Sequence, residues 1–193
     1  MANVDAPRGF TPIGYRGGKP YTGAARRYYK DATAGIIGVG DPVIRGTNSS
    51  DPEGGPEIVR ATTGAAITGV VVAIEPKYSN LMQMHLAAAD LGYVYVADDP
   101  ELLFEVQDTT GGTALAVTNI GEHIDSITAV NASTTTGRSL YEIDNAALAT
   151  GNTWRIEGLV NRPDNAVGEH AKWIVSANLH TEANASATNL TEV

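Results

Sequence analysis

The segment 93–107 constrains the fold of this chain more than any other. It holds two runs rich in β-branched and aromatic residues, separated by Asp98-Asp99-Pro100. Proline fixes φ and removes a backbone donor, so the chain must turn between two strands at this point. Similar runs recur along the chain, for example Gly69-Val-Val-Val-Ala-Ile74 and Ala171-Lys-Trp-Ile-Val175. Shorter runs at residues 115–117, 127–130 and 140–143 also predict strands. Short strands at this spacing predict an all-β sandwich or barrel of antiparallel strands.

Two further segments refine this prediction. In residues 153–160, Trp154 and Ile156 alternate with Arg155 and Glu157, so the two apolar side chains should face a core. Residues 79–91 are the one candidate helix, because apolar residues recur there behind a serine and an asparagine suited to capping. The same residues also fit an irregular crossing loop. We therefore expect at most one short helix.

A chain of 193 residues is long enough for one domain or two small ones. The strand-like runs predict a β-domain over residues 31–180, with a division into 31–110 and 111–180 as the alternative. Residues 181–193 are mostly Ala, Asn, Thr, Ser and Glu, with too few apolar side chains to bury. They are predicted to form a polar C-terminal tail.

Charge is unevenly placed along the chain. Residues 1–30 hold six of the 13 basic residues and one of the 22 acidic ones, which gives them a net charge of +5 against −14 for the remainder. No apolar period holds there, and Gly and Pro are frequent, so we expect an extended N-terminal arm. Such an arm would dock on an acidic surface, including that of a neighbouring copy, although a flexible solvated terminus fits equally well. The residues expected to bind a partner through this arm are Arg8, Phe10, Tyr15, Arg16, Arg26 and Arg27.

The composition argues against several classes of protein. There are no cysteines, which excludes disulfides and thiolate metal sites. The first seven residues lack the basic start and apolar core of a signal peptide, and the longest apolar run, residues 67–74, is too short to cross a membrane. Basic and aromatic residues interleave in the arm, as in single-strand nucleic-acid binders, but the acidic body would repel phosphates. We expect no membrane or nucleic-acid partner.

No arrangement of residues indicates catalysis or a cofactor. The four histidines are scattered, and no pair has a zinc-binding spacing. The tripeptide Gly-Glu-His occurs at residues 121–123 and 168–170, and a metal site would need both turns to converge with carboxylates such as Glu122, Asp125 and Glu169. The acidic pair Asp98-Asp99 is better explained as a turn than as a calcium site. We therefore predict no catalytic residue, metal or cofactor, and a protein that is not an enzyme.

Several segments together resemble a family of tailed-bacteriophage proteins that sit on the capsid shell, called decoration or cement proteins. The resemblance spans most of residues 1–180 and lies in Met1-Ala-Asn-Val-Asp-Ala-Pro7 with Gly9-Phe10, Gly40-Asp-Pro-Val43, Gly69-Val70-Val71, Val94-Tyr-Val-Ala-Asp-Asp-Pro100 with Phe104-Glu-Val-Gln107, Pro163-Asp-Asn165, Trp173 and Asn178-Leu-His180. It implies a β-domain, clustered as a homotrimer on the outer surface of the head, which ties major capsid protein subunits together. The match is lost between residues 15 and 27 and after His180.

Two other functions remain open at this point. Trp154, Trp173 and the tyrosines could form a stacking platform of a virion carbohydrate- or receptor-binding module, although tryptophans in strands are more often in a core. Exposed, coplanar rings would favour that alternative. A metal-dependent hydrolase would require the two Gly-Glu-His turns to meet.

Overall fold

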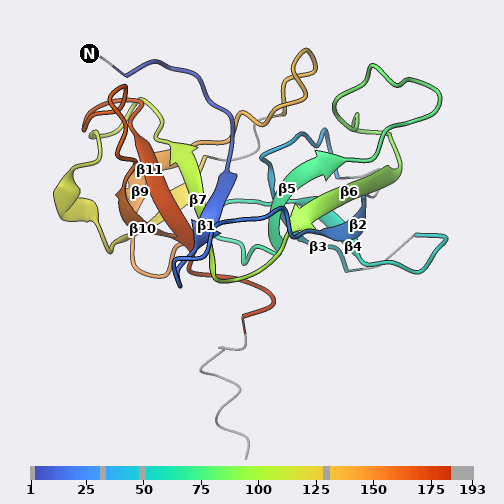
Figure 1. Cartoon of the computed structure of the whole chain (residues 1–193), viewed down its shortest axis with the longest axis horizontal. Coiled ribbons are helices and arrows are strands. Elements are labelled where there is room, and N and C mark those ends of the chain that lie inside the picture. Colours follow the sequence, from blue (N-terminus) through green and yellow to red (C-terminus); the bar gives the residue numbers. More distant parts are fainter. Residues whose placement is uncertain (1–2, 31–33, 48–50, 128–130, 184–193) are drawn as a thin grey trace, which may run out of the picture.

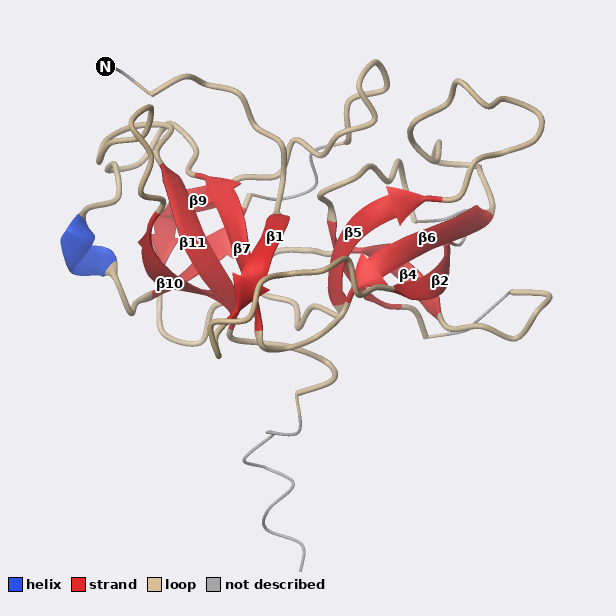
Figure 2. Cartoon of the chain, viewed as in Figure 1, coloured by secondary structure: helices blue, strands red, loops and turns tan. Residues whose placement is uncertain are grey.

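The chain folds into two β-sheets that lie beside one another, joined by loops (Figures 1 and 2). The structure is a computed structural model that describes residues 3–30, 34–47, 51–127 and 131–183. Within these residues the only helical element is one 3₁₀ turn, η1 (Val117–Asn119). The predicted all-β fold class is confirmed. In this described part of the chain, no helix has the length and apolar character of a membrane span.

One sheet is a closed five-stranded barrel in the order β2-β4-β3-β5-β6. Its strands are β2 (Arg26–Lys30), β3 (Pro42–Arg45), β4 (Glu57–Arg60), β5 (Gly69–Ile74) and β6 (Gly92–Ala97). Only β2 and β4 run parallel, and their pairing completes the ring. Consecutive valines in β5, Val70 and Val71, are both buried, because one faces the inside of the barrel and the other faces the second sheet.

The second sheet has six antiparallel strands in the order β1-β7-β11-β10-β8-β9. They are β1 (Thr11–Tyr15), β7 (Leu102–Gln107), β8 (His123–Ser126), β9 (Ile143–Leu148), β10 (Trp154–Leu159) and β11 (Lys172–Ala177). The expected alternation in β10 is confirmed, since Trp154 and Ile156 are fully buried while Arg155 is exposed.

The chain passes from the barrel to the six-stranded sheet at the turn predicted around Pro100. Strand β6 ends at Ala97 in the barrel, and β7 begins at Leu102 in the other sheet. The change of sheet therefore falls near residue 100, not at residue 110 as in the suggested subdomain division. Asp98 and Asp99 both have partners within the chain: Tyr28 Oη donates to Asp98 Oδ2 at 2.8 Å, and Glu101 N donates to Asp99 Oδ1 at 2.9 Å. These contacts agree with a structural turn.

The first thirty residues are extended, but they are not an arm separate from the body. Thr11–Tyr15 is the edge strand β1, paired with β7, and Arg26–Lys30 is the barrel strand β2, paired with both β4 and β6. The predicted boundary at residue 30 is therefore wrong for the described residues. At the other end, Thr181 N donates to Ile67 O at 2.8 Å, and Glu182 pairs with Arg45 at 3.0 Å, so the predicted tail begins against the body. Residues 184–193 of that tail lie outside the described part of the chain.

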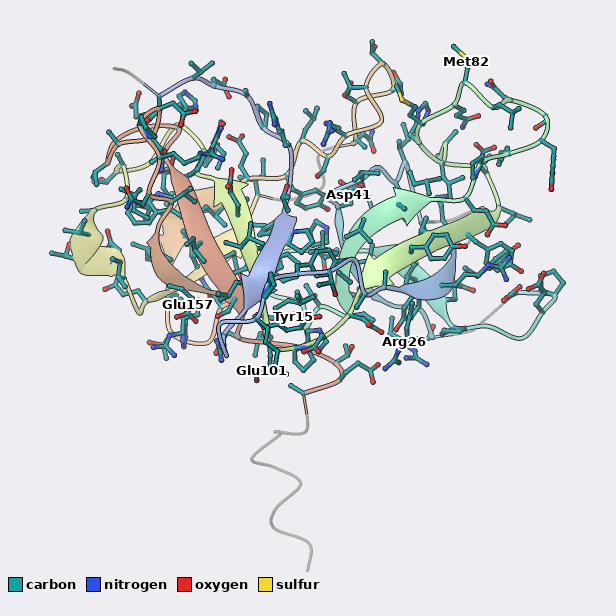
Figure 3. The ribbon with its side chains drawn as sticks, viewed as in Figure 1. Tyr15, Arg26, Asp41, Met82, Glu101 and Glu157 are labelled. Atoms are coloured by element: carbon teal, nitrogen blue, oxygen red, sulfur yellow. The ribbon has the colours of Figure 1, made fainter. Side chains whose placement is uncertain are left out.

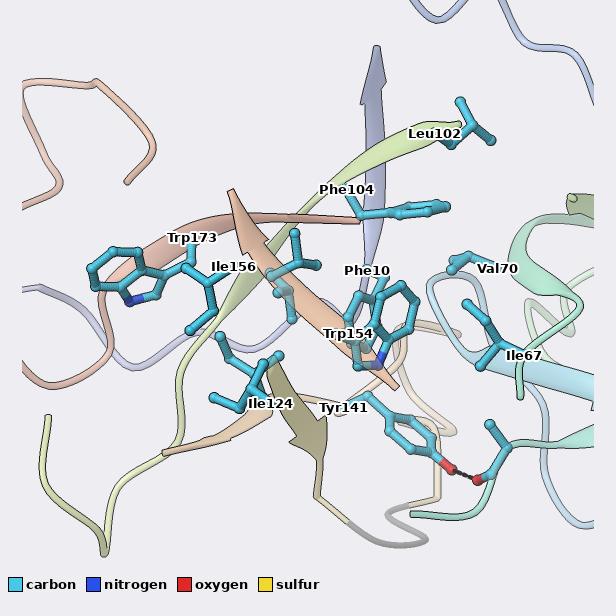
Figure 4. Close-up of a cluster of buried hydrophobic side chains, with 14 of the residues drawn as sticks. Phe10, Ile67, Val70, Leu102, Phe104, Ile124, Tyr141, Trp154, Ile156 and Trp173 are labelled. Atoms are coloured by element: carbon cyan, nitrogen blue, oxygen red, sulfur yellow. Dashed lines mark hydrogen bonds between the residues drawn. The ribbon is translucent and has the colours of Figure 1, made fainter. Parts of the chain in front are cut away.

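The core has two parts. One fills the barrel and includes Tyr28, Ile37, Ile58 and Leu86. The larger part joins residues of the six-stranded sheet with Val70 and Ala97 of the barrel, and both tryptophans are buried in it (Figure 4). Residues from both sheets contribute to this part, and Tyr141 links them, since its hydroxyl donates to Ala61 O at 2.8 Å. The two sheets are thus held together by shared apolar packing.

Some predicted elements are absent or displaced. The candidate helix at 79–91 is a loop of turns, so the helix prediction is wrong and the crossing loop is correct. The strand expected at 115–117 runs instead into η1, and the one expected at 140–143 begins only at Ile143. Most of the strand expected at 127–130 lies outside the described residues.

Candidate docking surface

The loop of residues 76–91, between β5 and β6, exposes large apolar side chains near its outer end. Met82 is 87% exposed and Tyr78 is fully exposed, with Leu81, Met84 and Leu91 each more than half exposed. Figure 3 shows Met82 directed away from the barrel, on the opposite side from Tyr15 and Arg26. Single exposed apolar residues are ordinary, but a cluster on one loop marks an interaction surface. We call residues 78–84 the apolar tip.

The tip forms because local hydrogen bonds favour turns over a helix. Pro76 follows the end of β5, and Asn80 N then donates to Lys77 O at 3.1 Å. The side chain of Asn80 also accepts from Met82 N at 3.2 Å, an Asx-type contact that competes with helical pairing. Because the segment forms turns, its apolar side chains do not line up on one side that could pack against the core.

The base of the loop is firmly attached to the barrel. Leu86 is buried, and its backbone pairs with Ile37 through two hydrogen bonds of 2.9 Å. Lys30 of β2 is also fully buried, and its Nζ donates to the carbonyls of Ala88 at 3.0 Å and Asp90 at 2.9 Å. A buried ammonium needs such acceptors, so Lys30 holds the returning half of the loop in place.

Asp90 closes the loop on itself. Its Oδ1 lies 2.6 Å from Lys77 Nζ, and its Oδ2 accepts from Ala87 N at 3.0 Å and Gln83 Nε2 at 2.7 Å. The bond from Lys77 is the main reason that the pKa of Asp90 lies below its usual value. An apolar tip on a fixed base loses less conformational entropy on binding than a free loop would.

A hollow lies beside the tip, between the loop and the segment 136–138. Gly137 permits this close approach, because its φ is +68° and a Cβ there would lie 2.1 Å from the carbonyl oxygen of Met84. Arg138, which is exposed, is the one charged residue that lines the hollow. The lining residues are Val39, Ile74, Pro76, Leu81, Gln83, Met84, Thr136, Gly137 and Arg138.

The residues predicted to bind through the arm lie elsewhere, and several have partners within the chain. Phe10 is buried, Tyr15 is half-buried against the core and Arg8 is exposed. Three arginines form ion pairs with the chain's own carboxylates: Arg16 with Glu157 at 3.0 Å, Arg26 with Asp98 at 3.1 Å, and Arg27 with Glu53 at 2.6 Å and Glu75 at 3.1 Å. The basic segment thus docks on an acidic surface of the same chain. Binding of a partner by these residues stays a prediction.

The two Gly-Glu-His turns do not converge as a metal site would require. His123 accepts from Gly151 N at 3.2 Å, and Asp125 accepts from Thr153 N at 2.9 Å. Glu122 accepts from Asn119 Nδ2 at 2.7 Å. His170 belongs to a different group with Asp5 and Glu142. Two of the carboxylates expected beside the histidines, those of Glu122 and Asp125, are therefore occupied by other contacts.

Sequence reasoning did not identify the apolar tip. Its signal was present, because two of the three methionines and two other large apolar residues follow Pro76 within nine residues. The loose spacing of these residues predicts a helix or a crossing loop, and neither pattern indicates that the side chains are exposed.

Comparison with protein-family models, with curated proteins and with solved structures found no match to this chain.

Proposed function

We propose that this chain is a structural decoration protein, without enzymatic activity, that binds the major capsid protein on the outer surface of a tailed-phage head. The resemblance of its segments to that family suggests the partner. The observation that carries the binding role is the apolar tip, which presents Leu81, Met82 and Met84 to solvent from a base fixed by Lys30. When a partner covers such side chains, the free energy of binding improves by about 25 cal/mol for each Å² of apolar area removed from water.

The tip is assigned to the shell and not to a second copy of the chain. It projects from one end of the barrel, as Figure 1 shows, and a narrow projection fits a depression on another protein. A stable interface between copies buries about 800 Å² on each partner, which needs a broad surface and not a narrow projection. The proposed homotrimer would therefore use a different part of the molecule. Methionine suits the tip, because its flexible thioether adapts to an irregular partner surface.

A lattice makes modest contacts sufficient. When a trimer engages several capsid subunits, its second and third contacts form within an already bound complex. Its overall affinity for the shell therefore exceeds that of a single contact by about 10²–10⁴-fold. The acidic body, with a net charge of −14 over residues 31–193, adds preference for a neutral or basic partner surface and works against nucleic acid.

The carbohydrate-binding alternative loses its main support. Trp154 and Trp173 are both completely buried, so they form no exposed stacking platform. Of the tyrosines, Tyr78 is the one fully exposed ring in the described residues, and it lies on the apolar tip.

Co-sedimentation tests the proposal. Heads of the virus that carries the gene are first stripped of this protein. Purified protein is then added, and the amount bound to the heads is measured in the pellet. We expect saturable binding, with a copy number that follows the symmetry of the shell. Absence of this chain from purified particles, together with no binding to stripped heads, would refute the proposal.

A further inference from the structure

Four side chains from distant parts of the chain converge where the N-terminal segment crosses the end of the six-stranded sheet. Asp5 precedes β1, Gln107 ends β7, Glu142 precedes β9 and His170 precedes β11. Single ligand atoms of Asp5, Glu142 and His170 all lie within 4.8 Å of one another. This is the one such group of His, Asp and Glu found in the described residues. Two carboxylates and an imidazole form a donor set that suits divalent transition ions.

The amide of Gln107 lies at the centre of the group. Its Nε2 is 3.0 Å from Asp5 Oδ1, 2.8 Å from Glu142 Oε1 and 3.3 Å from His170 Nδ1. The two hydrogens of the amide nitrogen can serve the two carboxylates, and the role of His170 Nδ1 depends on its tautomer. The Oε1 of Gln107 accepts from Ala6 N at 3.1 Å, which fixes the amide with its nitrogen toward the group, so Gln107 orients the other three side chains and is not itself a ligand. Gln107 is itself buried, so its amide is held at this position.

The charges and distances favour a cation. The group brings two carboxylates together, those of Asp5 and Glu142. Among the ion pairs of the described residues, none joins a lysine or arginine to either of these two. His170 Nδ1 lies 3.6 Å from Asp5 Oδ1, close to the separation of about 3.4 Å between two ligands on a tetrahedral zinc with bonds near 2.1 Å. The remaining pairs of ligand atoms lie within 4.8 Å, so these side chains must move closer together around a bound ion.

We propose that Asp5, Glu142 and His170 form a binding site for a divalent transition ion such as Zn²⁺, with Gln107 orienting the two carboxylates. The ion would fasten the N-terminal segment to the body of the protein. That segment is already held there by Asn3, whose Nδ2 donates to Ala166 O and Glu169 O at 2.8 Å each. Because the ion would add bonds that the unfolded chain lacks, it would stabilise the folded state.

Calorimetric titration with Zn²⁺ tests the site, using the full chain freed of metal by a chelator. We expect one Zn²⁺ per chain and an increase in Tm. Glu142→Gln and His170→Asn should each weaken binding at least about tenfold, the lower end of what ligand-orienting contacts contribute. Asparagine is chosen because residue 170 has a φ of +58°, which asparagine tolerates.

Two variants serve as matched controls. Glu169→Gln changes a carboxylate adjacent to His170, and His123→Asn changes the histidine of the other Gly-Glu-His turn. Both should bind Zn²⁺ as the unchanged chain does, and circular dichroism should show all four variants folded. No saturable uptake by the unchanged chain, or equal binding by His170→Asn and His123→Asn, would overturn the proposal. A variant that fails to fold is replaced by Asp5→Asn, which lies outside every strand.

Discussion

The ring of Phe10 lies stacked on the indole of Trp154, with centroids 4.1 Å apart and an angle of 16° between the planes. Phe104 meets the same indole edge-on at 5.7 Å. A residue of the segment expected to be a free arm is thus part of the central core. Removing the first thirty residues would take away Phe10 and two strands, so such a deletion would test folding and not binding.

Phe10→Ala should lower the free energy of unfolding by about 3–5 kcal/mol, because it leaves a cavity against Trp154. Urea denaturation followed by tryptophan fluorescence measures this change. Val4→Ala is the control in the same segment, since Val4 is 72% exposed and should lose little stability. Equal, small changes in the two variants would show that the N-terminal segment is not part of the core.

The strands that sequence reasoning identified best are those with clear alternation or β-branched runs. In β10 and β11, apolar residues alternate with polar ones or follow one another in β-branched runs. This pattern predicts that one side of each strand is buried, and the structure agrees. Strand β1 gives no such signal, because Pro12 and Gly14 interrupt it. Proline is acceptable there only because β1 lies at the edge of its sheet, which is a property of the whole fold.

In strand β2 and in the apolar tip, residue type predicts burial wrongly: polar residues are buried in β2, and apolar residues are exposed at the tip. Arg26-Arg-Tyr-Tyr-Lys30 is basic and polar, yet its last three residues are buried. Lys30 is buried because carbonyls about sixty residues later accept its hydrogen bonds, and no local pattern reveals such acceptors. At the tip, apolar residues with rough helical spacing remain exposed. Spacing predicts which residues share a side, but only tertiary structure decides whether a core covers that side.

Gly137→Ala should disturb the base of the apolar tip. Its positive φ alone costs a non-glycine residue about 1–2 kcal/mol. The close carbonyl of Met84 should add about 1–3 kcal/mol, as overpacking does. Hydrogen exchange at Leu86 should also become faster. Gly18→Ala is the matched control, because Gly18 has a φ of +80° and a methyl group added there would have no neighbouring atom within 4 Å. Equal losses of stability in both variants would argue against close packing at Gly137.

Protonation of Asp41 should add stability as the pH falls from 7 towards 4. Burial raises the pKa of Asp41 from 3.8 to about 6, despite hydrogen bonds from Ser139 and Gly38 N. The folded state therefore binds a proton at a higher pH than the unfolded chain, which favours the folded state as the pH passes below 6. The contribution of Asp41 over this range is about 3 kcal/mol at most.

Urea denaturation between pH 4.5 and pH 7.5 measures this dependence. Asp41→Asn should flatten the curve, because asparagine carries no titrating proton and its oxygen still accepts from Gly38 N. Part of the slope should remain, since burial also raises the pKa of Asp108 to about 6. Asp164→Asn is the exposed control and should leave the curve unchanged. A slope in Asp41→Asn equal to that of the unchanged chain would contradict the assignment.

The most direct measurement is head binding by a variant of the apolar tip. Leu81, Met82 and Met84 are changed together to serine, and binding to stripped heads is measured by co-sedimentation. The control changes Val117, Ile120 and Val167 to serine, since these are also exposed apolar residues but lie outside the tip. Both variants should keep their stability. We predict that the tip variant binds at least about tenfold more weakly, which corresponds to 1.4 kcal/mol, while the control binds normally. Equal binding by the two variants would contradict docking through the tip.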